Sequence, residues 1–170
     1  MGVLIVIVAI SSCTSQPVAN STYTDGVITF QYPADFKNAT PQSAVISGSK
    51  DWIQDLSLAN SNNIGINLYK NTNISNSETV NGIGQATVTN FKQVSSTNII
   101  SSARVTNPKG VELWVIKYTF TDPSTSNMDY AEAGFCIIKG SAYEIIAVGA
   151  NNSKSDVQQT AQTIFNSISG

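Results

Sequence analysis

The feature that most restricts the fold of this chain is a series of strand patterns whose connections are too short to contain a helix. The series consists of Ile99–Thr106, Val111–Phe120, Ala131–Ile138 and Ala142–Ala150. Asn107-Pro108-Lys109-Gly110 suits a type I turn, with proline second and glycine fourth, and Lys139-Gly140-Ser141 suits a tight hairpin. Parallel neighbours need a long crossover, so these strands are expected to pair antiparallel.

Both faces of these strands are apolar. Leu113 and Val115 alternate with Trp114 and Ile116, and Ala142–Ala150 shows a similar pattern. An antiparallel sheet with one face in water has a polar residue at every second position. This sheet is therefore expected to be covered on both faces.

Helical patterns supply the expected covers. Ser155 and Gln158 have the spacing of a capping box. Apolar residues then recur at helical intervals along one face: Val157, Ala161, Ile164, Phe165 and Ile168. The same capping-box spacing, Ser75 with Glu78, predicts an internal helix that runs toward Gln93.

The first half of the chain adds shorter strand patterns. Val27–Tyr32 ends at Pro33, which lacks the amide donor that a sheet ladder needs. Further strands are expected at Ala44–Ser47, Trp52–Ala59 and Ile64–Lys70. The sequence thus predicts one α+β domain, an antiparallel β-sheet of about five to seven strands covered by helices on both faces.

Two segments carry a family resemblance. GVITFQYPADF at Gly26–Phe36 and a C-terminal helix ending in IFNSISG resemble the PsbP-like lipoproteins of prokaryotes, although Phe36 stands where many members have tryptophan. The resemblance spans nearly the whole mature chain and implies an α/β/α sandwich. Members are mostly non-enzymatic binding or assembly factors. Photosynthetic members attach to the oxygen-evolving photosystem and a eukaryotic relative binds the Ran GTPase, but no functional motif carries over to this chain.

Cys13 closes the string Ile10-Ser11-Ser12-Cys13 after an apolar run from Gly2 to Ile10. The run is about half the roughly twenty residues that a membrane-spanning helix needs, and it fits the apolar core of a signal peptide. The string resembles a prokaryotic lipobox, in which the thiol receives a lipid. We expect a signal peptide at 1–12, a lipidated Cys13 with a flexible tether at 13–22, and one PsbP-like domain at 23–170. The protein would then lie on the extracytoplasmic face of the cell membrane.

One departure from a normal signal peptide is that neither lysine nor arginine precedes the apolar run. We therefore expect the signal peptide to be truncated at its N-terminus. The alternative is a buried N-terminal strand with an incidental cysteine.

The composition excludes several functions. The chain has no histidine, so the usual general base and the Ser-His and Cys-His forms of nucleophilic catalysis are excluded. A formal net charge of −2 with few charged residues gives no basic stripe, and no nucleic-acid partner is expected. Cys136 lies in an apolar string, which predicts a buried structural thiol.

Carboxylates are the remaining candidates for site chemistry. Asp122 and Asp129 bracket a loop rich in serine that could hold Ca²⁺, but their spacing matches no calcium loop, so we expect a solvated loop with no metal or cofactor. Asp51 and Asp55 suggest no catalytic pair. Glu112 and Glu144 interrupt apolar strands. Each is expected at a strand edge, the alternative being a buried carboxylate with a raised pKa.

Other side chains carry weaker hypotheses. Trp52, Trp114, Tyr118 and Tyr143 could line a ligand groove, although aromatic residues at strand spacing are more often core. Arg104, the only arginine, cannot define a phosphate site alone. Gly82-Ile83-Gly84 lacks the third glycine of a dinucleotide fingerprint.

Three functions remain open. The preferred one is a non-enzymatic, lipid-anchored accessory domain that binds a protein partner, for which an exposed apolar patch is expected. The alternative is a receptor for a small ligand or ion, with a pocket between the sheet and one helix. A carboxylate or Ser-Lys hydrolase is the third, and it would need a nucleophile within hydrogen-bond reach of a base.

Overall fold

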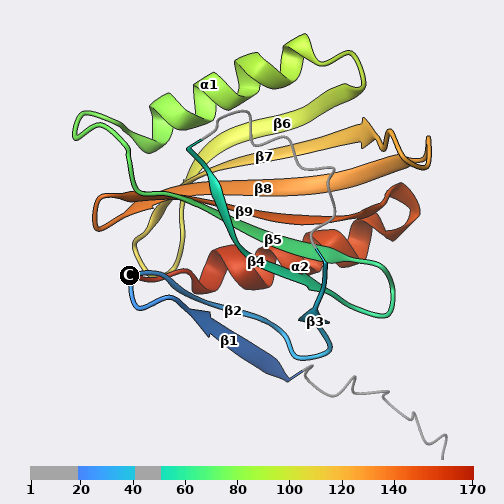
Figure 1. The fold of residues 1–170 in the computed structure, drawn as a ribbon, viewed down its shortest axis with the longest axis horizontal. Coiled ribbons are helices and arrows are strands. Elements are labelled where there is room, and N and C mark those ends of the chain that lie inside the picture. The colour runs from blue at the N-terminus through green and yellow to red at the C-terminus, as the bar shows by residue number, and fades with distance from the viewer. Residues whose placement is uncertain (1–18, 41–50) are drawn as a thin grey trace, which may run out of the picture.

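A computed structural model describes residues 19–40 and 51–170. This part of the chain forms a seven-stranded antiparallel sheet, a separate two-stranded sheet and two α-helices (Figure 1). The elements are β1 (Asn20–Thr24), β2 (Thr29–Pro33), β3 (Lys37–Asn38), β4 (Ile53–Ala59), β5 (Gly65–Asn71), α1 (Val80–Gln93), β6 (Thr97–Thr106), β7 (Glu112–Thr121), β8 (Met128–Ile138), β9 (Ser141–Ala150), a short 3-10 helix (Asn151–Ser153) and α2 (Lys154–Ser167). The predicted α+β class and antiparallel sheet are confirmed.

The strand order of the large sheet is β3-β4-β5-β9-β8-β7-β6. The two predicted hairpins form β6–β7 and β8–β9, and Gly110 and Gly140 take the positive φ angles that their turns require. β9 pairs with β8 on one side and with β5 on the other. The strand that comes last in the chain is therefore the central strand of the sheet.

Apolar side chains form two clusters that alternate along the strands. On β9, Ile145 belongs to a cluster with Val157, Ala161 and Ile164 of α2. The next residue, Ile146, belongs to a cluster with Phe91 of α1. Successive side chains of a strand point to opposite faces, so these α2-side and α1-side clusters lie on opposite faces of the sheet.

β2 lies in the predicted strand Val27–Tyr32, but its pairing with a preceding strand β1 is not expected from the sequence. β1 begins at Asn20, inside the segment predicted as a flexible tether, and the turn is held by Asp25, whose carboxylate accepts the amides of Val27 and Ile28 at 2.8 Å. Lys70 donates to the same carboxylate at 2.6 Å. Burial raises the pKa of Asp25, but this ion pair and the amide donors outweigh it and bring the pKa to about 2.

The hairpin is also joined to the C-terminal segment. Thr29 and Ser169 form an isolated antiparallel bridge, in which each amide donates to the other carbonyl at 2.9 Å. Ile28 and Phe30 extend the α2-side cluster, so the hairpin covers one end of α2 (Figure 1).

Neither helix starts at its predicted cap: α1 starts later than Ser75 predicts, and α2 starts earlier than Ser155 predicts. The N-cap of α1 is Thr79, whose hydroxyl accepts from the Gly82 amide at 3.0 Å, while Ser75 forms a preceding turn. α2 begins at Lys154 directly after the 3-10 helix, so Ser155 lies inside the helix and caps nothing. The strand predicted at Ala44–Ser47 lies outside the described residues.

Cys136 is fully buried in the α2-side cluster with a free thiol, and burial raises its pKa to about 12. Within residues 19–40 and 51–170, no helix is both long enough and apolar enough to span a membrane.

Candidate ligand-binding pocket

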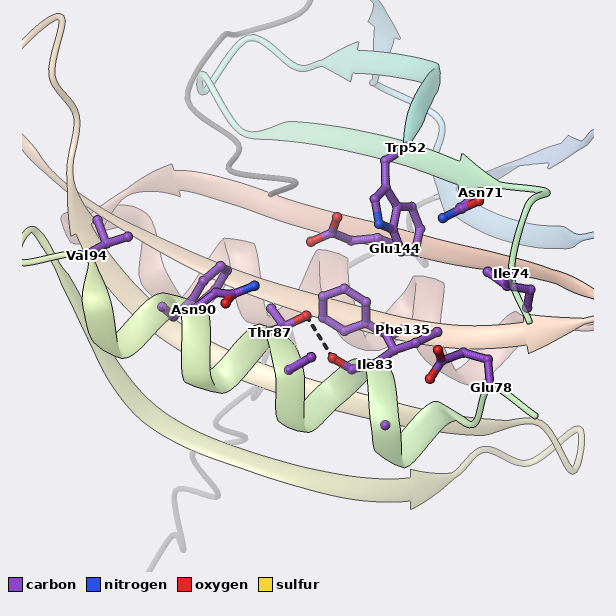
Figure 2. A pocket seen from close by; sticks show the side chains of 13 residues that line it. Trp52, Asn71, Ile74, Glu78, Ile83, Thr87, Asn90, Val94, Phe135 and Glu144 are labelled. Carbon is purple, nitrogen blue, oxygen red and sulfur yellow. Dashed lines mark hydrogen bonds between the residues drawn. The ribbon is translucent and has the colours of Figure 1, made fainter. Parts of the chain in front are cut away.

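A pocket of about 300 Å³ lies between α1 and the large sheet, and we call it the α1 pocket (Figure 2). Its lining includes Ile83, Thr87, Asn90 and Phe91 of α1, Phe135 of β8, Glu144 of β9, and Trp52, Asn71, Ile74 and Glu78. The pocket is thus built from segments before, inside and after the helix and from the centre of the sheet.

Helix α1 can lie close to the sheet because of a glycine. A side-chain carbon at Gly84 would overlap the indole ring of Trp114, so the helix backbone rests on that ring. Phe91 anchors the other end of α1, with its ring 4.7 Å from that of Tyr118. The pocket lies beside these two contacts.

Glu144 is the unusual residue of the α1 pocket. Its side chain comes from the central strand and is only 2% exposed. Within the described residues the structure gives its carboxylate neither a hydrogen bond nor an ion pair, and Figure 2 shows it directed into the pocket. Burial raises the pKa of this carboxyl to about 8.

The other buried glutamate shows what is missing at Glu144. Glu132, 3% exposed, receives an ion pair from Lys117 at 3.0 Å and a hydrogen bond from the Tyr130 hydroxyl at 2.6 Å. A buried carboxylate is costly unless it is paired in this way. At Glu144 the compensating donors are not supplied by the described chain.

The prediction that Glu112 and Glu144 lie at strand edges is half wrong. Glu112 begins β7, has a side chain 50% exposed and pairs with Arg104 at 3.4 Å, as an edge residue would. Glu144 instead lies in the middle of the sheet. The pKa of Tyr69 is raised mainly by burial and further by the nearby Glu144 carboxylate. The sequence signal was its place in the run Ala142–Ala150, which is otherwise almost entirely apolar.

Of the aromatic residues considered from the sequence, only Trp52 lines the α1 pocket, where its ring meets that of Phe135 edge-on at 6.5 Å. Trp114 packs beneath α1, and its indole N–H is buried with no acceptor among the described residues. Tyr118 belongs to the α1-side cluster. Tyr143 lies on the opposite face, where its hydroxyl donates to Asp25 at 3.1 Å.

In the described part of the chain, Asp55 and Asp122 accept hydrogen bonds from hydroxyl and amide donors. Asp122 accepts hydrogen bonds from the Ser124 amide and hydroxyl and from Thr125 in its own exposed loop, which lowers its pKa. Burial, and then the charge of Asp122, raise the pKa of Asp129. Asp55 accepts from the Tyr23 hydroxyl at 2.6 Å. The described residues hold no group of three potential His, Cys, Asp or Glu metal ligands. Cys13 lies outside them.

A second hollow, of about 540 Å³, lies on the α2 side of β6 and β7. Its charged lining residues, Lys117 and Glu132, already pair with each other. The α1 pocket, although smaller, is therefore the better candidate, because its buried carboxyl group has no partner among the described residues and is available to a ligand.

No known protein-family model matches the sequence, and no curated protein is significantly similar to it. Solved structures are similar in fold. Cyanobacterial PsbP (CyanoP) from Synechocystis sp. PCC 6803 has 15% identity and a TM-score of 0.62, over 94% of this chain and 98% of that one. LpqN of Mycobacterium tuberculosis has 10% identity and a TM-score of 0.60, over 89% and 90%.

A protein of unknown function, PA94 from Pseudomonas aeruginosa, has 8% identity and a TM-score of 0.51, over 85% of this chain and 95% of that one. The chain therefore has a PsbP-like fold. At these identities the similarity concerns the fold alone, and function has to be argued from the site.

Proposed function

We propose that this chain is a non-enzymatic accessory protein of the cell envelope, anchored through Cys13 on the extracytoplasmic face, which binds a small ligand in the α1 pocket. The observation that carries the proposal is the buried carboxylate of Glu144, which lines a pocket with apolar walls and has no partner among residues 19–40 and 51–170. Concave apolar sites with a few convergent polar groups are the usual form of small-molecule sites.

The similar folds support the setting of this function. The structure of LpqN is described as that of a protein involved in cell envelope biogenesis, and CyanoP is a cyanobacterial PsbP. The proposed location also agrees with a lipobox ending at Cys13. The chain also has no histidine, and the serine-carboxylate pair Ser124–Asp122 is an exposed contact between sequence neighbours that does not line the α1 pocket.

The ligand can be sought directly on the protein. Native mass spectrometry of protein purified from membranes is expected to show a small molecule bound to the wild type. Thr87→Phe should lose it, because Thr87 lines the pocket and the ring would fill it. Thr89→Phe is a matched control. Both hydroxyls donate to the carbonyl four residues earlier, at 3.0 and 2.9 Å, but Thr89 is exposed and outside the lining. Failure to find any bound species, or equal loss in both variants, would refute the proposal.

Protein contact is a second candidate function, favoured by the edge of the large sheet. β6 pairs only with β7 in the described part of the chain, and Ile100 and Val105 are 47% and 41% exposed on it. An extended segment of a partner could add to such an edge as a further strand. Crosslinking in native membranes should then recover a partner with the wild type but not with Val105→Lys. Recovery of the same proteins with both would argue against this edge.

A further inference from the structure

We infer that the α1 pocket binds an organic ammonium compound, an amine carried on an aromatic or aliphatic body, whose N–H groups donate to the carboxylate of Glu144. The inference rests on the proposed small-ligand function and specifies the chemical class of the ligand. Its argument combines the charges of the lining, the nature of the walls and the size of the cavity.

The charges of the lining are of one sign. Among the described residues, Glu144 and Glu78 are the charged side chains that line the α1 pocket, and the lysines and arginine of residues 19–40 and 51–170 do not line it. A buried carboxylate is satisfied when a cation with N–H donors lies against it, as Lys117 does against Glu132. In the part of the chain that the structure describes, no such cation pairs with Glu144, so a ligand that carries one would complete the pair.

The walls of the pocket suit the rest of such a ligand. Trp52 and Phe135 present aromatic rings, which attract cations over their faces and also bury hydrocarbon. Ile83 and Phe91 extend the apolar surface along α1. The side-chain oxygen of Asn71, a residue only 9% exposed, accepts an amide hydrogen bond at 2.8 Å and retains a second lone pair for an N–H donor. A cavity of about 300 Å³ accommodates a small molecule rather than a peptide.

The pairing predicts a pH dependence with a definite sign. Among the described residues, the titratable groups that face Glu144 are Tyr69 from β5, Tyr118 from β7 and Glu78 across the pocket, and the charged side chains of α1 and β8 do not line the pocket. Since only the ionised carboxylate pairs with an ammonium group, binding should tighten as pH rises toward the Glu144 pKa of about 8. From about pH 6 to about pH 8 the dissociation constant should fall roughly 50-fold.

The test uses phenethylammonium and its neutral isostere 2-phenylethanol, titrated into the full folded chain by calorimetry at several pH values. Phenethylammonium is expected to bind with the pH dependence above, and 2-phenylethanol at least tenfold more weakly near pH 8. Glu144→Gln should weaken phenethylammonium binding and abolish its pH dependence. Glu112→Gln removes the same charge from an exposed residue and should leave binding unchanged.

The outcomes separate the two proposals. Equal binding of both compounds would overturn the ammonium inference while leaving a small-ligand pocket. Binding of phenethylammonium that is unaffected by Glu144→Gln, or no binding at millimolar concentration, would also overturn it. If Glu144→Gln fails to fold, the Thr87→Phe and Thr89→Phe pair decides, because only the first should lose phenethylammonium.

Discussion

Glu144 shows how one uncompensated side chain links the stability of the molecule to pH. Its carboxyl is buried in the central strand and has a pKa of about 8, against an ordinary value of 4.5. Between these two values the folded protein holds a proton that the unfolded chain has released. The free energy of unfolding should therefore fall as pH rises from about 4.5 to about 8, and level off above it.

Glu144→Gln is predicted to remove this slope, because the amide does not ionise. At about pH 8.5 the variant should be more stable than the wild type, by up to roughly 3–5 kcal/mol. Urea unfolding at about pH 5 and about pH 8.5 measures the effect. The exposed Glu112→Gln serves as control and should keep the wild-type slope. An unchanged slope in Glu144→Gln would contradict the assignment of the raised pKa to this residue.

Two neighbouring glycines of α1 should respond to alanine in opposite ways. At Gly84 a methyl group would overlap the Trp114 ring, so Gly84→Ala is predicted to destabilise the protein by about 1–3 kcal/mol. At Gly82 the nearest atom is the Glu78 carboxylate at 2.6 Å, on an exposed and flexible side chain that can move away. Gly82→Ala should stabilise by up to about 1 kcal/mol, through helix propensity.

Thermal melting of both variants tests the contact between α1 and the sheet. If Gly84→Ala is as stable as Gly82→Ala, the helix does not rest on Trp114 as described. Glycine lowers the intrinsic helix propensity of α1, but Gly84 also allows the helix to pack on Trp114, and such packing supplies most of the stability of a helix in a protein.

At the scale of elements, the start of α1 gives a further prediction. Thr79→Ala removes the hydroxyl that accepts the Gly82 amide and should cost about 1 kcal/mol of unfolding free energy. Ser75→Ala should have a much smaller effect, because Ser75 lies in an exposed turn ahead of the helix. Chemical denaturation of both variants measures the two losses of unfolding free energy. A larger loss for Ser75→Ala than for Thr79→Ala would place the start of α1 at Ser75, as the capping-box spacing predicts.

The strands of the second half were predictable from sequence, whereas several smaller elements were not. β7 to β9 have apolar residues on both faces, and turn residues separate β6 from β7 and β8 from β9, so the apolar pattern and the turn residues indicate the same strands. β1, with the sequence NSTYT, has no apolar alternation and forms because Asp25 holds its turn and α2 supports β2. β3 has only two residues, too few to leave a pattern.

The α1 pocket was only partly predictable for a related reason. A groove between the sheet and a helix was one expectation, and Trp52 was among its candidate residues. Local sequence does not reveal strand order, and it therefore predicts a strand-edge position for Glu144. Only the pairing of β9 with β5, across more than seventy residues of chain, makes it central.

At the scale of the whole molecule, the proposed lipid anchor makes attachment of the protein to the membrane depend on the thiol of Cys13. Cys13→Ser is predicted to move the protein from the detergent phase to the aqueous phase in phase partitioning of cell lysates, because two buried acyl chains would be lost. Cys136→Ala is the matched control, since it removes the other cysteine of the chain, whose thiol is buried. Retention of Cys13→Ser in the detergent phase would contradict lipid anchoring.

The bridge between Thr29 and Ser169 has a consequence for how the molecule is made. The early hairpin is bridged to Ser169, and the central strand β9 also lies late in the described chain, so the native core is complete only when residue 169 is available. If the domain crosses the membrane as an unfolded chain on its way to the proposed Cys13 anchor, this topology would delay folding until the domain has reached the far side.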